Sequence, residues 1–297
     1  MTILDGKKIS NTIKDEIKEE VDQIKERGEK VPHLVAVLVG NDGASQTYVN
    51  SKVKSCERVG FESTLIKLEN TITELELLRQ IDKLNKNKDI DGFIVQLPLP
   101  PQIDTQKVIM AIDPNKDVDG FHPANFGKMA LDMTSFIPAT PFGILELLER
   151  YDVETKGKHT VVIGRSHIVG RPMSILMGRK GWPGNSTVTQ THSHTKNITQ
   201  IISQADIVIS ALGIPNFLKA EMVKDDAVVI DVGITRVPDD TRKRGYRIAG
   251  DVDFEAVSKK ASFITPVPGG VGPMTISMLL KNTLLAREMH LNREMKG

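Results

Sequence analysis

A tyrosine and a lysine share one face of a predicted helix. The segment 43–56 reads Gly-Ala-Ser-Gln-Thr-Tyr-Val-Asn-Ser-Lys-Val-Lys-Ser-Cys and places Tyr48 and Lys52 four residues apart, a spacing at which helical side chains are neighbours. A lysine at the edge of a binding site can polarise water, donate a proton, or accept one when desolvation lowers its pKa. Most helical lysines are simply solvated. Spacing alone therefore leaves both interpretations of Lys52 open.

Three further segments could line a ligand site. Gln96 follows the apolar run 92–95, at the end of a predicted strand, where open α/β sheets usually bind ligands. Asp119 lies in a charged loop bounded by proline and glycine, where a turn-forming aspartate is the simpler interpretation. The loop 265–273 carries glycines that let the backbone approach a flat ligand, and Thr275 after it could cap a helix.

A glycine turn suggests a phosphate-binding loop. Residues 161–172 read Val-Val-Ile-Gly-Arg-Ser-His-Ile-Val-Gly-Arg-Pro, a buried strand followed by a turn and the start of a helix. Such a turn lets backbone N–H groups approach a pyrophosphate. Ser166 replaces the second glycine of the usual motif, and the last glycine, Gly170, falls one residue late. Taken alone, the turn is equally compatible with an ordinary strand-to-helix loop.

The following strand favours NADP over NAD. NAD enzymes usually place a carboxylate at the end of this strand to hold the ribose 2′-hydroxyl. Here the strand 187–191 is followed by His192, Ser193 and His194, with no carboxylate. Arg165, Ser166 and Ser193 could instead bind a 2′-phosphate through charged and hydroxyl donors. The alternative makes Arg165 a solvated surface residue.

These residues lie on alternating apolar runs and helical stretches, a pattern typical of parallel sheets covered by helices. Apolar residues recur every three or four positions over 4–27, which predicts a long first helix ending near Gly28. Strands are predicted at 34–39, 63–68, 92–97, 160–163, 187–191, 207–211, 228–232 and 263–267. Further helices are predicted at 45–59, 74–84, 105–112, 141–151 and 275–288. The pattern divides into two α/β series near residue 140.

The bulk composition excludes several classes of protein. The 297 residues are enough for two α/β domains. With 39 Lys and Arg against 38 Asp and Glu, no net field favours nucleic acid or a membrane surface. One cysteine, Cys56, excludes a disulfide framework, and the histidines lack metal-ligand spacing. Without a membrane span or signal sequence, the composition predicts a cytoplasmic protein with no metal.

Five motifs together resemble one enzyme family. They are Tyr48-Val-x-x-Lys52, Gln96-Leu-Pro-Leu-Pro, Lys116-Asp-Val-Asp119-Gly, Gly164-Arg-Ser166 with Ile168-Val-Gly170, and Pro266-Val-Pro-Gly-Gly-Val-Gly-Pro273-Met-Thr. Over essentially its whole length the chain closely resembles the bifunctional methylenetetrahydrofolate dehydrogenase/cyclohydrolases. Five motifs in the family order are far more specific than any one of them.

The resemblance implies an α/β fold of two domains with a deep cleft between them. The first, 1–138, is a folate-binding catalytic domain to which a C-terminal helix at 275–297 returns. The second, 139–274, is a Rossmann-type NADP-binding domain. The implied function is oxidation of 5,10-methylenetetrahydrofolate with NADP and hydrolysis of the methenyl product to 10-formyltetrahydrofolate. The implied partners are tetrahydrofolate derivatives and a second copy of the chain, in a homodimer.

The resemblance also implies residue roles. Lys52 would be the central catalytic group, with Gln96 hydrogen-bonding it and setting its protonation. Tyr48 would orient the folate rings, and Asp119 would anchor the pterin. The remaining folate contacts would come from the loop residues Pro268, Gly269 and Gly270. The cofactor would be lined by Gly164, Arg165, Ser166, Ser193 and Ile234.

Departures from the family pattern leave some contacts open. Ala139 occupies a position where relatives often carry a cysteine, so that thiol is not essential here. Thr235 stands where asparagine is common, which affects the nicotinamide side. The stretch 179–185 is longer than the usual connection and is interpreted as a surface insertion.

Two alternative functions follow from the same residues. One is a dehydrogenase with little cyclohydrolase activity, which the presence of both Lys52 and Gln96 disfavours. The other is a non-catalytic folate- or nucleotide-binding protein that keeps only the fold. A degenerate binder would be expected to lose some members of the set Tyr48, Lys52, Gln96 and Asp119.

Overall fold

The computed structural model describes residues 1–242 and 245–294 and forms two compact units. Unit 1 comprises Met1–Ser10 with Thr140–Thr275, and unit 2 comprises Asn11–Ala139 with Ile276–Gly297. The N-terminal residues therefore differ from the predicted division at 138. They belong to unit 1 because β1 (Thr2–Ile3) pairs in parallel with β11 (Phe263–Ile264).

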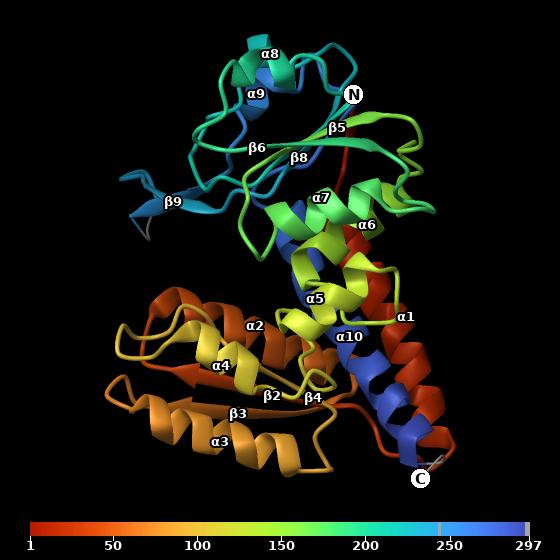
Figure 1. Cartoon of the computed structure of the whole chain (residues 1–297), viewed down its shortest axis with the longest axis vertical. Helices are drawn as coiled ribbons and strands as arrows, with labels where there is room; N and C mark the ends of the chain where they lie inside the picture. The colour runs from red at the N-terminus through yellow and green to blue at the C-terminus, as the bar shows by residue number, and fades with distance from the viewer. Residues whose placement is uncertain (243–244, 295–297) are drawn as a thin grey trace. The chain divides into compact units, whose positions relative to one another are not determined.

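Unit 2 is built on a short parallel sheet with the strand order β3-β2-β4 (Figure 1). The strands are β2 (His33–Val39), β3 (Glu62–Leu68) and β4 (Gly92–Val95). All residues of β2 are buried, as expected of a central strand covered on both faces. The helices are α2 (Gly43–Val59), α3 (Glu74–Lys86), α4 (Thr105–Ala111) and α5 (Pro123–Ala130). Apolar side chains of α3 and α4 pack on Val35, Val37 and Phe93 of the sheet.

Two long helices contribute residues to both units. They are α1 (Gly6–Glu26) and α10 (Val271–Glu294). The predicted periodicity of the first helix is confirmed, because Ile13, Ile17 and Val21 are buried at spacings of four residues. Residues 295–297 of the predicted C-terminal helix lie outside the described residues.

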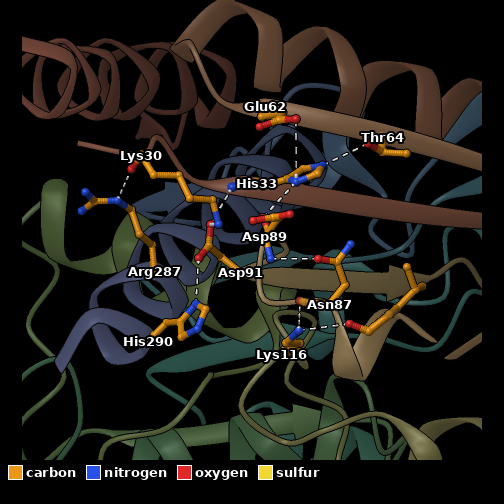
Figure 2. Close-up of polar contacts among 11 residues, drawn as sticks. Lys30, His33, Glu62, Thr64, Asn87, Asp89, Asp91, Lys116, Arg287 and His290 are labelled. Atoms are coloured by element: carbon orange, nitrogen blue, oxygen red, sulfur yellow. Dashed lines mark hydrogen bonds and ion pairs between the residues drawn. The ribbon is translucent and has the colours of Figure 1, made fainter. Parts of the chain in front are cut away.

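A cluster of hydrogen bonds and ion pairs connects α10 to the sheet of unit 2 (Figure 2). The buried Asp91 carboxylate accepts the backbone N–H of His33 at 2.8 Å. The same carboxylate faces Lys30 Nζ at 3.5 Å and His290 Nδ1 at 3.4 Å. Arg287 Nε donates to the Lys30 carbonyl at 2.6 Å. The C-terminal helix is thus held against residues that flank β2 and β4.

Unit 1 holds a six-stranded sheet in the order β1-β11-β8-β7-β5-β6, in which every pair is parallel. Its other strands are β5 (His159–Ile163), β6 (Thr187–Thr191), β7 (Ile207–Ser210) and β8 (Val228–Asp231). Its helices are α6 (Ala139–Arg150), α7 (Gly170–Gly178), α8 (Ile198–Ile202), the 3₁₀ turn η1 (Ala220–Met222) and α9 (Phe254–Val257). Figure 1 shows α8 and α9 on one face of the sheet and α7 on the other. The predicted α/β class, with a parallel sheet covered by helices, is confirmed.

The strand order identifies where this sheet would bind a ligand. The chain leaves β5 for β6 on one side and then returns to β7 on the other side of β5. In open α/β sheets, ligands bind at the carboxyl ends of the strands at such a switch point. The loops after β5 and β7 therefore flank the expected crevice.

Several predicted boundaries are corrected. The strand predicted at 263–267 ends at Ile264, because prolines follow it. The last helix begins at Val271, so Thr275 lies inside it and does not cap it; its hydroxyl instead pairs with Thr140 Oγ1 at 3.1 Å. The antiparallel hairpin of β9 (Thr235–Pro238) and β10 (Tyr246–Ala249) was not predicted, and neither was α5.

Candidate functional site

Lys52 is held on α2 with its amine buried. The helix begins after Asp42, whose carboxylate accepts the Ser45 N–H at 2.7 Å, and it ends at Gly60, which adopts a left-handed φ of 81°. Lys52 is only 5% exposed, and its Nζ donates to Gln96 Oε1 at 3.2 Å. Gln96 Nε2 donates in turn to the Leu97 carbonyl at 2.8 Å. That second bond fixes the amide so that its oxygen faces the lysine.

The surroundings of Lys52 set its proton affinity. Burial lowers the pKa of Lys52, while the charges of Asp119 and Cys56 act in the opposite direction. The Tyr48 ring centroid lies 4.8 Å from Lys52 Nζ, which is a cation–π distance. An amine whose pKa is lowered loses its proton more readily, and in the neutral form it can act as a general base.

Asp119 is partly buried beside a loop that a second aspartate organises. Burial raises the pKa of Asp119, and the Lys52 charge lowers it. Asp117 accepts the His122 N–H at 2.8 Å and Asn125 Nδ2 at 2.9 Å, and burial raises its pKa to about 7. Both aspartates line a small pocket together with Val95 of β4. Sequence reasoning missed Asp117, although it stands two residues before Asp119 in the same motif.

The glycine turn of unit 1 leaves no room for a side chain at its two glycines. Gly164 has φ 121°, and a Cβ placed on it would lie 2.5 Å from the Ala211 carbonyl oxygen. A Cβ on Gly170 would lie 2.3 Å from the Gly164 oxygen. Ser166 Oγ accepts the N–H groups of Val169 and Gly170 at 3.1 and 3.3 Å. Because the Ser166 oxygen is the acceptor in both bonds, its hydroxyl can still act as a donor to a ligand.

The residues at the carboxyl ends of β5 and β6 fit a 2′-phosphorylated cofactor. Arg165, Ser166 and Ser193 are all exposed there, and no carboxylate ends β6. Ile234 is 62% exposed after β8, and Ile214 is 52% exposed after β7. Exposed isoleucines at this edge offer apolar surface to a flat ring. Sequence reasoning missed Ile214, because an isolated isoleucine near a strand end gives no signal of its exposure.

The Pro268–Gly270 loop rests on the start of α1. Lys7 N–H donates to the Gly269 carbonyl at 2.9 Å. A Cβ on Gly6 would lie 1.8 Å from the Gly270 carbonyl oxygen. The loop therefore requires glycine at position 6, and this contact helps to explain why residues 1–10 belong to unit 1.

Comparison with known proteins identifies the family. The model for "Tetrahydrofolate dehydrogenase/cyclohydrolase, catalytic domain" matches residues 4–119, and that for the "NAD(P)-binding domain" of the same enzymes matches 138–291. The chain belongs to this family. The "Bifunctional protein FolD" of Christiangramia forsetii is 80% identical over 293 residues, covering 99% of this chain and 98% of that protein.

Solved structures of the dehydrogenase/cyclohydrolase family share the whole fold. FolD from Campylobacter jejuni, described as a methylenetetrahydrofolate dehydrogenase/cyclohydrolase, is 46% identical with a TM-score of 0.91, and 99% of each chain is covered. The Trypanosoma brucei methylenetetrahydrofolate dehydrogenase-cyclohydrolase, solved with NADP and an inhibitor, is 38% identical with a TM-score of 0.93 and 98% coverage of each chain. The predicted family is confirmed.

The structure also bears on the remaining predictions. It brings Tyr48, Lys52 and Gln96 together within unit 2, while the five predicted cofactor residues lie in unit 1. Among residues 1–242 and 245–294, no group of three or more His, Cys, Asp or Glu side chains is arranged so that it could hold a metal ion. Within the same ranges, no helix is long and apolar enough to cross a membrane.

Proposed function

We propose that Lys52 transfers the protons of the hydrolysis reaction and helps to position the folate for both reactions. The chain oxidises 5,10-methylenetetrahydrofolate with NADP and hydrolyses the methenyl product to 10-formyltetrahydrofolate, as a member of the dehydrogenase/cyclohydrolase family. The observation that carries the residue assignment is the buried Lys52–Gln96 hydrogen bond of 3.2 Å. Burying an amine is costly, and a purely structural position would favour an apolar side chain.

We assign the folate to unit 2 and the cofactor to unit 1. Asp119 would bind the pterin amino and ring N–H groups through its carboxylate, and Tyr48 would orient the rings. The Pro268–Gly270 loop belongs to unit 1, and its predicted folate contacts rest on the family motif alone. These assignments rest on the family motifs and on the burial of Lys52 with Asp119 beside it. Under these assignments the boundary predicted at 138 separates the catalytic residues from the cofactor residues. Residues 1–10 belong to unit 1, on the cofactor side of that boundary.

NADP, when bound, supplies the hydride acceptor for the dehydrogenase reaction. Gly164 would let the backbone approach the pyrophosphate, and Arg165, Ser166 and Ser193 would bind the 2′-phosphate. Ile234 would contact the cofactor through its exposed side chain. The protein contributes orientation to this step, because the one-carbon bridge has to face the acceptor at reacting distance.

Hydrolysis requires proton transfer as well as orientation. A water oxygen attacks the methenyl carbon, and neutral Lys52 accepts the proton that this water releases. The remaining hydroxyl proton then moves to the ring nitrogen N5 as the carbon–N5 bond breaks, which leaves the formyl group on N10. Gln96 holds the Lys52 amine at the position where it can relay these protons.

Cofactor preference is the first test of the assignment. We expect a much higher specificity constant for NADP than for NAD, because no carboxylate ends β6 while the exposed donors Arg165, Ser166 and Ser193 follow β5 and β6. Arg165→Ala should raise the KM for NADP about tenfold or more, the effect of losing one charge-assisted contact, and should change the folate KM far less. Lys180→Ala is the control, because Lys180 is exposed and follows the C-terminal end of α7, whereas Arg165 precedes its N-terminal end. Equal specificity constants for the two cofactors would refute the assignment.

We also propose that the chain is a cytoplasmic homodimer. Two-fold dimers are the commonest assembly of soluble enzymes, and the outer edge of β6 carries no strand partner among the described residues. Unit 1 is therefore the expected dimer surface. Sedimentation at micromolar concentration should give a species of twice the chain mass, and a single species of the monomer mass would contradict the proposal.

A further inference from the structure

Two buried carboxylates lie at the carboxyl edge of the unit 1 sheet, and the proposed reaction does not use them. Asp231 ends β8 and is 3% exposed, while Asp251 follows β10 and is fully buried. Among the described residues, neither carboxylate is paired with a lysine, arginine or histidine. Both carboxylates instead accept hydrogen bonds from N–H and O–H groups, and the position of these donors shows which segments the carboxylates hold in place.

The donors to Asp251 come from the end of β7 and the loop after it. Its Oδ2 accepts the Leu212 N–H at 2.7 Å and the Ser210 hydroxyl at 3.2 Å. Its Oδ1 accepts the Ile214 N–H at 2.9 Å. One carboxylate therefore fixes two alternate backbone groups of the loop 211–214, on either side of Gly213, which has φ 71°.

Asp231 fixes the backbone that carries Asp251. Its Oδ1 accepts the N–H groups of Gly233 and Asp251, both at 2.9 Å, and its Oδ2 accepts the Val252 N–H at 3.0 Å. Through Gly233, Asp231 also holds the loop after β8. The two carboxylates thus join the loops after β7 and β8 to the segment 250–252.

The backbone packs closely against the carboxylates of Asp231 and Asp251. A Cβ on Gly250 would lie 1.9 Å from Asp231 Oδ2, and one on Gly233 would lie 2.3 Å from Asp251 Oδ1. Thr235 Oγ1 donates to the Gly213 carbonyl at 3.2 Å, which links the loops after β7 and β8 directly. Thr235, the departure from the family pattern, therefore has a structural role here.

The loop after β7 borders the expected cofactor crevice. The closest group to a Cβ on Gly164 would be the Ala211 carbonyl oxygen, so this loop touches the phosphate-binding turn. A dinucleotide lies across the switch point with its adenosine half over the strand that follows the glycine turn, here β6. The other half then falls on the side of β7 and β8, where Ile214 and Ile234 are exposed.

We propose that Asp251, supported by Asp231, is the positioning residue for the nicotinamide half of the cofactor site. It acts through the backbone of the loop 211–214 and does not touch the cofactor itself. By holding this loop, it sets the place of Ile214 beside the phosphate turn. The inference rests on the proposed cofactor site in unit 1.

The test compares the whole cofactor with its adenosine half. Asp251→Asn keeps the size of the side chain but replaces one acceptor oxygen with a donor, which opposes a backbone N–H of the loop. In the full-length protein, titration calorimetry should show the Kd for NADP raised about tenfold or more. The Kd for adenosine 2′,5′-bisphosphate should stay within about twofold, because that ligand reaches only the β5 and β6 side.

Asp253→Asn is the matched control. Asp253 lies two residues further on, and its partly exposed carboxylate accepts from Lys219 Nζ at 3.1 Å. Both Kd values should be unchanged in this variant. If Asp251→Asn does not fold, Ser210→Ala decides the question, because it removes one donor to Asp251 and leaves both carboxylates in place. It should raise the Kd for NADP severalfold and spare the bisphosphate.

The outcomes separate this inference from the proposed function. An unchanged Kd for NADP in Asp251→Asn would overturn the inference, and so would an equal loss of both ligands. If the wild-type protein fails to bind the bisphosphate, or if Arg165→Ala leaves its Kd unchanged, the proposed cofactor site itself is wrong.

Discussion

Replacing Lys52 by methionine should reduce cyclohydrolase turnover about a hundredfold or more at saturating methenyl substrate, the usual contribution of a positioned proton-transfer group. Methionine fits the space of the buried side chain but can neither accept a proton nor bond Gln96 Oε1. Hydride transfer requires only orientation, so the dehydrogenase reaction should retain more of its rate. The measurement is the two half-reactions assayed separately, each from its own substrate.

The control for this prediction lies on the same helix. Lys54→Met changes an exposed lysine two residues away and should leave both rates within about twofold. Gln96→Ala should act in the direction of Lys52→Met, because it removes the oxygen that holds the amine. A Lys52→Met enzyme with near-normal cyclohydrolase turnover would remove Lys52 from the proposed role. A rise in folate KM alone would make it a binding residue.

The sequence predicts the parallel strands well because their apolar runs are unambiguous. The β-branched apolar run around Val35 and Val37 favours a covered strand, and the structure buries it completely. The hairpin of β9 and β10 escapes prediction because Arg236 and Arg247 interrupt its short strands with charge. The two-residue strand β1 is too short to show any period.

The site was only partly predictable, since its parts meet through long-range contacts. Lys52 and Gln96 are 44 positions apart, and no local spacing connects them; the family motifs did. In the sequence, Asp117 and Asp251 look like ordinary loop aspartates. Their carboxylates accept backbone N–H groups that come close only when the chain is folded. Ile214 has an apolar side chain, whose exposure depends on the loop that Asp251 holds.

Replacing Asp119 by asparagine tests the folate anchor and the electrostatics of Lys52 in one variant. A carboxylate that accepts two N–H groups of the pterin contributes charged hydrogen bonds of about 1.5–3 kcal/mol each. Losing the charge should therefore raise the folate KM about 10- to 100-fold in both reactions. Asp82→Asn, an exposed change on α3 whose carboxylate pairs with Lys86, should leave both KM values unchanged.

The pH profile of the same variant gives an independent readout. In the wild-type protein the Asp119 charge raises the pKa of Lys52 and opposes the lowering caused by burial. Asp119→Asn removes this opposition, so the pKa of Lys52 should fall further. If the neutral amine accepts the proton, cyclohydrolase turnover at saturating substrate is lost as the pH falls through that pKa. The acid limb of the profile should then move to lower pH in Asp119→Asn. A limb that stays in place, or that moves to higher pH, would show that the acid limb does not report the neutral amine of Lys52 acting as the base.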